Sequence, residues 1–453
     1  MDIIITIFAL SLLVFIHELG HFLIARFFGV KIEVFSIGIG PKIFKYESGG
    51  TIYALSLIPL GGYCSMKGEQ QDKGGEIEID SLSAKKWWQR ILVVLAGPMF
   101  NLFLAWILII ASFYIGRSYN DMSPIISSAD NQYSIYFHEN DEILEVNGQE
   151  VKSYTDIFRY TKENSENIFL VKRSVNDEDG VEHRFSSYIT FKVDDLYDFY
   201  SALSPQTSNI IGDVSPGLPA WKAGIRKGDK ILRINDLPVN NWKEVRDGIA
   251  FSENDIIRLL VEREGRTLEL TLIAEKNILS ETNQRMIGIT QHLDLTFHEK
   301  SNFLTSIGYG SITTITVIYL NYKTLYNLFT NPTSLKNSIG GPIMLYYMTS
   351  HTTKRGLSDF MTLIAMISIV LMIMNLLPIP VFDGGHIMFF LYEGIMKKSL
   401  PISIQWRLQQ FGFTLIVFLM VYVFYSDINK TFQKFSSEMK WQKILPTEGN
   451  DLE

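Results

Sequence analysis

The pentapeptide His-Glu-Leu-Gly-His at residues 17–21 is the part of this chain whose residue types and spacing could do chemistry. On a helix, His17 and His21 share one face, so their two imidazoles can bind one Zn²⁺. Glu18 would then lie beside the open coordination position, where it can accept a proton from water. The surrounding stretch, residues 3–24, is otherwise apolar, and ionisable groups at membrane depth usually mark function. The pattern predicts a metalloprotease site inside a membrane.

The segment 1–24 also has two simpler interpretations. A secretory signal peptide is disfavoured, because the segment starts with Asp2, carries no preceding Lys or Arg and lacks a small-residue cleavage site after it. A chance match to the short motif remains open when the motif is taken alone.

A catalytic zinc usually takes three protein ligands, and Asp383 is the best candidate for the third. It ends the run 375–383, in which two prolines should break an apolar helix, and two glycines follow it. A carboxylate at this depth is costly unless something binds it. Asp383 could instead cap a turn. His386 competes as a ligand but ranks lower, as a second-layer or turn residue.

The composition indicates a membrane protein. Of 453 residues, 47% are hydrophobic, and the mean hydropathy is positive. A net charge of −7 argues against a nucleic-acid-binding face. The single cysteine, Cys64, permits no intrachain disulfide and is interpreted as incidental.

The fold class expected is a polytopic α-helical membrane protein with four transmembrane helices, at about 3–27, 91–116, 360–381 and 404–425. The stretch 298–358, and 303–320 in particular, is ambiguous. We predict an interfacial or membrane-dipping segment, because a further crossing there would place Asp383 on the opposite side of the membrane from the histidines.

Lysine and arginine counts set the orientation. They gather between the first two spans and again after residue 390, so both regions are predicted to be cytoplasmic. Both termini and the region 118–297 are then extracytoplasmic, and the active site lies toward the cytoplasmic leaflet. The lysines of the tail, 427–453, weigh mildly against this orientation.

The extracytoplasmic region contains an internal repeat. Residues 140–154 and 228–242 align without gaps, and each is followed by a helix-like segment and a strand. Two copies of one small β-rich domain are therefore expected, at 118–205 and 206–297.

A β-hairpin is expected at about 31–67, between the first two spans. Its strands, 32–39 and 51–57, are joined through glycine-rich bends. Irregular backbone at membrane depth must be covered by protein, so the hairpin should dip into the cytoplasmic leaflet beside the helices.

Taken together, these motifs resemble those of the site-2 protease family of intramembrane zinc metalloproteases, over nearly the full chain. Besides the pentapeptide, the matching positions are Asn375, Pro378 and Pro380 before Phe382-Asp383-Gly384 (Phe where the family has Leu), Gly97-Pro98-x-x-Asn101, and Ser36-Ile-Gly38-Ile-Gly40-Pro41.

The resemblance implies one Zn²⁺ per chain, held by His17, His21 and Asp383, with Glu18 as the catalytic base. It implies a bacterial inner-membrane enzyme that cuts within the transmembrane segments of single-span proteins, such as an anti-sigma factor in an envelope-stress cascade, and remnant signal peptides. Asn375 would hydrogen-bond the substrate backbone, or alternatively it would hydrogen-bond the backbone carbonyl groups of its own broken helix.

Two further expectations follow from the resemblance. Gly38 and Gly40 lie in the hairpin that the family places beside its active site, and are predicted to contact substrate. The repeated domains resemble tandem PDZ domains, and the second copy matches at 214–229, whereas the first has Asn140 where Gly228 stands. Whether they bind peptide termini or only exclude bulky proteins remains open.

Three rival functions are less well supported. A PDZ scaffold with a dead metal site should lack a ligand or the glutamate, and all four residues are present. A transporter should show inverted repeats among its spans, whereas the repeat in this sequence lies outside them. A membrane-anchored soluble metalloprotease should carry its motif outside the apolar run.

Overall fold

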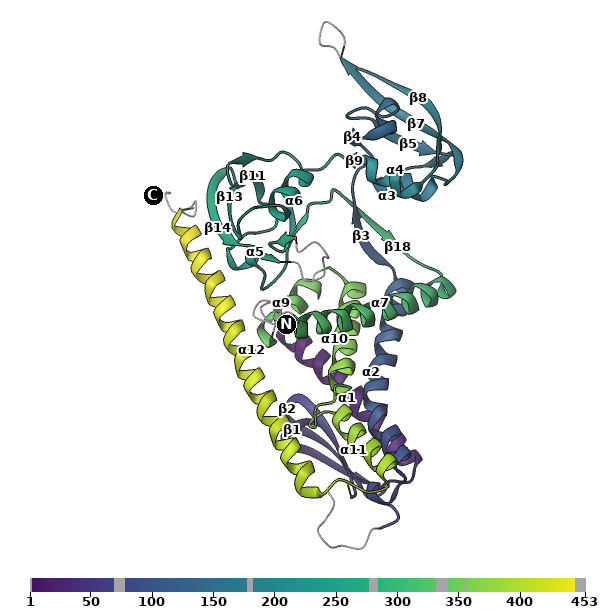
Figure 1. Ribbon diagram of the computed structural model, residues 1–453, viewed down its shortest axis with the longest axis vertical. Helices are drawn as coiled ribbons and strands as arrows, with labels where there is room; N and C mark the ends of the chain where they lie inside the picture. Colours follow the sequence, from purple (N-terminus) through teal and green to yellow (C-terminus); the bar gives the residue numbers. More distant parts are fainter. Residues whose placement is uncertain are drawn as a thin grey trace. The chain divides into compact units, whose positions relative to one another are not determined.

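The computed structural model in Figure 1 describes residues 2–68, 78–176, 182–276, 284–330, 341–353 and 355–444. The chain divides into two compact units, each assembled from segments distant in sequence. The helical unit comprises Met1–Arg117 and Lys300–Asn429, and the β-rich unit comprises Ser118–Glu299 and Lys430–Glu453.

The helical unit is built around long apolar helices. They are α1 (Asp2–Phe27), α2 (Trp87–Ile115), α7 (Phe303–Thr330), α9 (Pro342–Thr353), α10 (Leu357–Asn375), α11 (Asp383–Met396) and α12 (Ile402–Ile444), with a short 3₁₀ turn at Leu82–Ala84 before α2. Among the described residues, five helices (α1, α2, α7, α10 and α12) are long and apolar enough to cross a membrane.

Two predicted helix boundaries differ from the structure. The span expected at 360–381 ends at Asn375, because Pro378 and Pro380 cannot continue a helix. The span expected at 404–425 continues to Ile444, into the region 427–453 that the sequence predicts to be a tail. Within the β-rich unit, the Ser437 hydroxyl near the end of α12 donates to the Lys222 carbonyl, with 3.0 Å between the oxygens.

The α7 helix meets the same criteria of length and hydropathy as the predicted spans, so these criteria do not decide whether it crosses. Figure 1 shows α7 lying crosswise to α2. The two helices approach closely at Gly310, where a Cβ atom would lie 2.5 Å from the Ile110 side chain, and Trp106 Nε1 donates to Ser311 Oγ at 3.0 Å. This orientation favours the interfacial interpretation, which stays a prediction.

Small residues and hydroxyl groups hold α1, α2 and α10 together. A Cβ atom on Gly20 would lie 2.5 Å from the carbonyl oxygen of Ala96, so the backbones of α1 and α2 nearly touch. The Ser368 hydroxyl of α10 donates to the Asn101 carbonyl of α2 at 2.8 Å. Close approach through small residues and interhelical hydrogen bonds is how helices associate in lipid.

The predicted hairpin is a more elaborate sheet. It consists of β1 (Ile32–Ser48) and β2 (Thr51–Met66), and both strands bend. Residues 34–37 consequently pair with 52–55 on one side and with 62–65 on the other. The bends occur where Gly38, Gly40 and Gly61 have φ of 86°, 95° and 103°, a region that favours glycine. The strand expectation therefore missed 42–48 and 61–66.

The β-rich unit contains the predicted repeat. One sheet has the order β6-β5-β7-β8 and the other the order β12-β11-β13-β14. The first sheet comprises β5 (Glu142–Val146), β6 (Gln149–Glu150), β7 (Ser165–Asn176) and β8 (Glu182–Val193), with α3 (Tyr154–Tyr160); the second comprises β11 (Lys230–Ile234), β12 (Leu237–Pro238), β13 (Ile256–Arg263) and β14 (Arg266–Ile273), with α6 (Trp242–Ala250). Asn147 and Asn235, 88 residues apart, occupy equivalent turns with φ of 54° and 53°.

Shorter elements complete this unit. The paired strands are β3 (Arg117–Asp121) with β18 (Leu295–Glu299), β4 (Ile126–Ala129) with β9 (Leu203–Pro205), β10 (Ile211–Val214) with β17 (Ile289–Gln291), and β15 (Glu275–Lys276) with β16 (Arg285–Met286); the short helices are α4 (Leu196–Ala202), α5 (Pro219–Lys222) and a 3₁₀ turn at Asn131–Ile135. Each four-stranded sheet packs with neighbouring helices around a hydrophobic core of its own. Two similar domains are thus present, and their identity as PDZ domains remains a prediction.

Candidate active site

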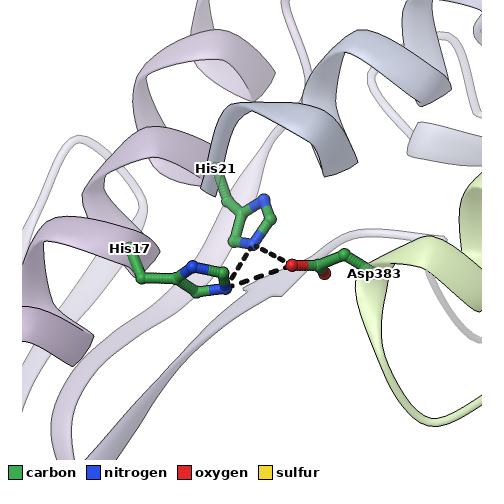
Figure 2. Close-up of side chains that lie close together, drawn as sticks. All are labelled: His17, His21 and Asp383. Atoms are coloured by element: carbon green, nitrogen blue, oxygen red, sulfur yellow. Dashed lines mark hydrogen bonds and ion pairs between the residues drawn. The ribbon is translucent and has the colours of Figure 1, made fainter. Parts of the chain in front are cut away.

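Helices α1 and α11 bring together the three side chains that the sequence predicts to bind a metal. His17 Nε2 lies 3.2 Å from Asp383 Oδ2, and His21 Nε2 lies 3.6 Å from the same oxygen. The two Nε2 atoms are 3.2 Å apart. Figure 2 shows both rings facing the carboxylate at the start of α11. Donor atoms from α1 and α11, which are far apart in the sequence, therefore lie within 3.6 Å of one another.

The triangle of donor atoms fits a zinc ion. Bonds of about 2.0–2.2 Å place the ligand atoms of a tetrahedral zinc site roughly 3.3–3.5 Å apart. The observed separations of 3.2, 3.2 and 3.6 Å match this spacing. Asp383 Oδ2 is also buried, and its nearest polar neighbours are the two Nε2 atoms, so a cation between the three atoms would compensate the buried carboxylate oxygen. Among the described residues, these three form the only group of His, Cys, Asp and Glu suited to a metal.

One face of α2 prepares the histidines for this role. His21 Nδ1 lies 2.9 Å from the Val93 carbonyl oxygen. Because a carbonyl only accepts hydrogen bonds, Nδ1 carries the proton and Nε2 keeps its lone pair for a metal. One turn further along α2, a Cβ atom on Gly97 would lie 2.3 Å from His21 Nε2 and 2.8 Å from His17 Cε1. Only glycine leaves room for both imidazoles.

The broken segment after α10 positions the carboxylate. Both glycines that follow Asp383 pack directly on backbone: a Cβ on Gly384 would lie 2.3 Å from the Leu377 carbonyl oxygen, and one on Gly385 would lie 2.4 Å from that of Ile379. The chain can therefore fold back tightly and begin α11 at Asp383. This explains why a proline-rich run and two glycines flank the carboxylate.

The three donor side chains line a cavity of about 930 Å³ within the helical unit. Glu18 lines it from α1, and residues 63–66 line it from the edge of the sheet. Gly62 brings this edge close to α1, since its Cβ would lie 3.4 Å from the Glu18 side chain. The Cys64 backbone lies within hydrogen-bonding reach of the Glu18 carboxylate. The expected base, the three donors and the edge of β2 thus line one cavity.

The lower-ranked sequence predictions fall in different places. Asn375 and His386 line the cavity, and His386 lies outside the group of three donors. Gly38 and Gly40 are absent from the residues that line it; they lie at the bends of β1. The strand edge beside the donors is 61–66, a segment that the strand pattern does not single out.

Sequence reasoning also missed the ion pair in the cavity wall. The buried Arg90 guanidinium of α2 pairs with the Glu393 carboxylate of α11 and lies 4.7 Å from the centre of the Phe390 ring. The pair joins the helix that holds the histidine partners to the helix that carries Asp383. No spacing rule connects residues so distant in sequence.

The chain is similar to known peptidases over most of its length. The model of peptidase family M50 matches residues 5–419. A protein of Borreliella burgdorferi whose name is that of a zinc metalloprotease is 30% identical, with 94% of this chain and 98% of that protein covered. The regulator of sigma E protease of Haemophilus influenzae is 31% identical (93% and 97%), and the protease RseP of Yersinia pestis is 30% identical (94% and 97%).

These matches extend over almost the whole chain, including every helix that carries a donor. Together with the apolar helices, they identify a multi-pass membrane protein. The chain belongs to peptidase family M50, the site-2 proteases, and is a metalloprotease.

Proposed function

We propose that this protein is an intramembrane zinc protease that hydrolyses a peptide bond within the transmembrane segment of a single-span membrane protein. The observation that carries the proposal is the position of His17 and His21. They lie inside the apolar span Ile4–Phe27, and their Nε2 atoms converge with Asp383 Oδ2. A protease with its donors at this depth acts on a substrate that is itself in the membrane.

His17, His21 and Asp383 would hold one Zn²⁺ per chain. When bound, the ion supplies Lewis-acid polarisation of the scissile carbonyl and lowers the pKa of water toward neutrality. The protein's part is to fix the three donors, to leave one side open toward the cavity, and to keep lipid away from the reacting groups.

Glu18 is the proposed general base. It would accept a proton from the attacking water and pass it to the leaving nitrogen as the C–N bond breaks, so that one carboxylate and one amine are released. Its neighbours support this role, because the Cys64 backbone orients the carboxylate from the sheet edge while the helix places it one residue from His17.

The edge strand 61–66 is the proposed substrate-binding element. A transmembrane helix hides its peptide bonds, so the substrate must unwind before cleavage. An unwound segment could add to the edge of β2 that faces the cavity and gain backbone hydrogen bonds there. Asn375, on the cavity wall, is placed to hydrogen-bond the same segment. Gly38 and Gly40 would serve by bending β1 so that the edge faces α1.

The β-rich unit is the proposed size filter. Two small folded domains outside the membrane would exclude intact proteins and admit those already trimmed, such as an anti-sigma factor or a remnant signal peptide. The names of the Haemophilus and Yersinia relatives support an anti-sigma substrate. The proposed location is a bacterial inner membrane, with the β-rich unit and both termini periplasmic and the donors toward the cytoplasmic leaflet.

Co-expression with a tagged single-span substrate that lacks its external domain tests this proposal. Wild type should cut the substrate, and Glu18→Gln should not, although its purified form should keep zinc. Glu33→Gln, an equally conservative change at an exposed position of β1, is the matched control and should cut normally. Cleavage by Glu18→Gln would refute the assignment of the base. Absence of zinc from the wild type would refute the metal site.

A further inference from the structure

We propose that Asn101 is a positioning residue that sets the tautomer of His17 by turning its side-chain amide. In the metal-bound state its Oδ1 accepts the Nδ1–H of His17, which leaves Nε2 free to bind the ion. This inference rests on the proposed metal site. It assigns a role to Asn101, the residue of the Gly97-Pro98-x-x-Asn101 run that has no role in the mechanism above.

The geometry places Asn101 beside the one ring nitrogen that needs a partner. Asn101 Nδ2 lies 3.3 Å from His17 Nδ1. The residue is only 1% exposed, and its Oδ1 is buried with no hydrogen-bond partner. A buried carbonyl oxygen without a donor is unfavourable by about 1–3 kcal/mol. The amide therefore has an unused acceptor within a few ångströms of the imidazole.

When Nε2 of His17 binds a metal, Nδ1 changes from a hydrogen-bond acceptor to a donor. A neutral imidazole carries one proton, and an Nε2 that coordinates a cation must give its proton up, so Nδ1 becomes a donor. Asn101 Nδ2 is also a donor and cannot serve it. A half-turn about the Cβ–Cγ bond exchanges the amide nitrogen and oxygen, and then Oδ1 faces Nδ1–H. The same rotation uses the acceptor that is otherwise orphaned.

The second histidine supplies an internal comparison. His21 Nδ1 already donates to the Val93 carbonyl, an acceptor that cannot turn. Val93, Gly97 and Asn101 follow each other at intervals of four along α2 and so lie on one face of it. On that face, the Val93 carbonyl is a fixed acceptor and the Asn101 amide is an acceptor that can rotate. Gly97 lies between them and leaves space for both imidazole rings. His21 is locked in its metal-binding form, whereas His17 can adopt either form.

The backbone of Asn101 is held independently of its side chain. Ser368 Oγ of α10 donates to the Asn101 carbonyl oxygen at 2.8 Å. The amide can therefore turn while α2 and α10 stay in register. Removing this hydrogen bond provides a control, because it alters the packing at Asn101 but leaves the Oδ1 acceptor in place.

The test is the zinc affinity of full-length protein in detergent, measured by competition with a chromophoric chelator. Asn101→Leu keeps the branched shape, in a somewhat larger side chain, but removes the acceptor, and should weaken zinc binding about 10–100-fold. Asn101→Asp keeps an acceptor at the same position and should restore affinity to near that of wild type. Ser368→Ala should bind zinc normally. The visible spectrum of the Co²⁺-substituted protein should change for Asn101→Leu alone, because its ligand field reports how His17 is oriented.

Each outcome separates the inference from the function on which it rests. If wild type binds zinc and Asn101→Leu binds it equally well, the role of Asn101 is wrong and the metal site stands. If Asn101→Leu and Ser368→Ala weaken binding to the same extent, Asn101 acts through packing and the inference is again overturned. If wild type binds no zinc, the metal site fails and the inference with it. Thermal unfolding of each metal-free variant shows whether it folds.

Discussion

The molecule buries a carboxylate in two very different ways. In the β-rich unit, Asp229 is 1% exposed, and its two oxygens receive the Arg263 guanidinium at 2.7 Å and 2.6 Å. In the helical unit, the Asp383 side chain is 18% exposed, and its buried Oδ2 faces the Nε2 atoms of two imidazoles at 3.2 Å and 3.6 Å. The first carboxylate is neutralised by its own chain. The second is arranged for a charge that the chain does not supply.

This difference explains why one buried acid stabilises a fold and the other serves chemistry. In a buried ion pair with matched geometry, each charge compensates the other. Removing one partner leaves the other charge buried and uncompensated, which strongly lowers the free energy of unfolding. An acid that shares its oxygen with two imidazoles forms a set of three ligand atoms, and a cation bound between them completes it. The contrast predicts that mutations at Asp383 act on metal content, whereas mutations at Asp229 act on the stability of a domain.

The largest expected effect is the loss of zinc and of proteolysis in Asp383→Ala. The site would lose its only anionic donor, so metal content should fall from one equivalent to near zero and cleavage to background. Hydrogen exchange in the β-rich unit should be unchanged. Metal analysis of the purified protein, together with the cleavage assay, measures both. Full zinc retention in Asp383→Ala would mean that another residue is the third ligand.

Gly97→Ala should have the next largest effect. The added Cβ would lie 2.3 Å from His21 Nε2, well inside contact distance, so one imidazole must leave its position. We expect at least a roughly 100-fold loss of cleavage, the effect of displacing a catalytic group by about 1 Å. Gly308→Ala, a glycine with nothing within 4 Å of its Cβ, is the matched control and should cleave normally. Normal cleavage by Gly97→Ala would contradict the packing of the two rings against α2.

The site illustrates what sequence can and cannot reveal. Spacing alone predicts that His17 and His21 share a helix face, and the chemistry of zinc demands a third ligand. The roles of Val93 and Gly97 depend on how α1 packs against α2, which is fixed where Gly20 meets Ala96. That register is a tertiary property, and no periodicity within either helix encodes it.

The same limit applies to the fold. The repeat is predictable, because two copies of one domain leave matching letters in the sequence. The strands 42–48 and 61–66 were missed since glycines with positive φ bend β1 and β2 in mid-course, and such bends resemble strand ends. The substrate contact of Gly38 and Gly40 follows from the family resemblance and stays a prediction, and residues 63–66 are the part of the sheet that lines the cavity with Glu18.

Asp229→Asn should act on stability alone. It removes the carboxylate charge that the buried Arg263 guanidinium binds, and breaking a buried ion pair in this way costs about 3–5 kcal/mol. Hydrogen exchange of β11 and β13 in the full-length protein should accelerate accordingly, while zinc content should stay at the wild-type level. A loss of zinc in this variant would break the comparison, because the two acids would no longer act on separate properties.

The smallest expected effect belongs to Asp141→Asn, the equivalent change in the first copy of the domain. Asp141 lies 88 residues before Asp229 and binds Arg173 with similar geometry, at 2.8 Å and 2.7 Å. The hydrogen bonds that Arg173 donates to Asp141 raise the pKa of the guanidinium, which therefore stays charged at all ordinary pH values.

The two pairs differ in what surrounds the arginine. The side chain of Arg173 is 20% exposed, against 6% for Arg263. Water can therefore solvate Arg173 after its partner is neutralised, and we expect a loss of about 1–3 kcal/mol, less than for the second copy. Hydrogen exchange of β5 and β7, measured beside that of β11 and β13, gives the two losses on one scale. Equal losses would mean that solvent access to the arginine does not govern the cost of an unpaired charge in these domains.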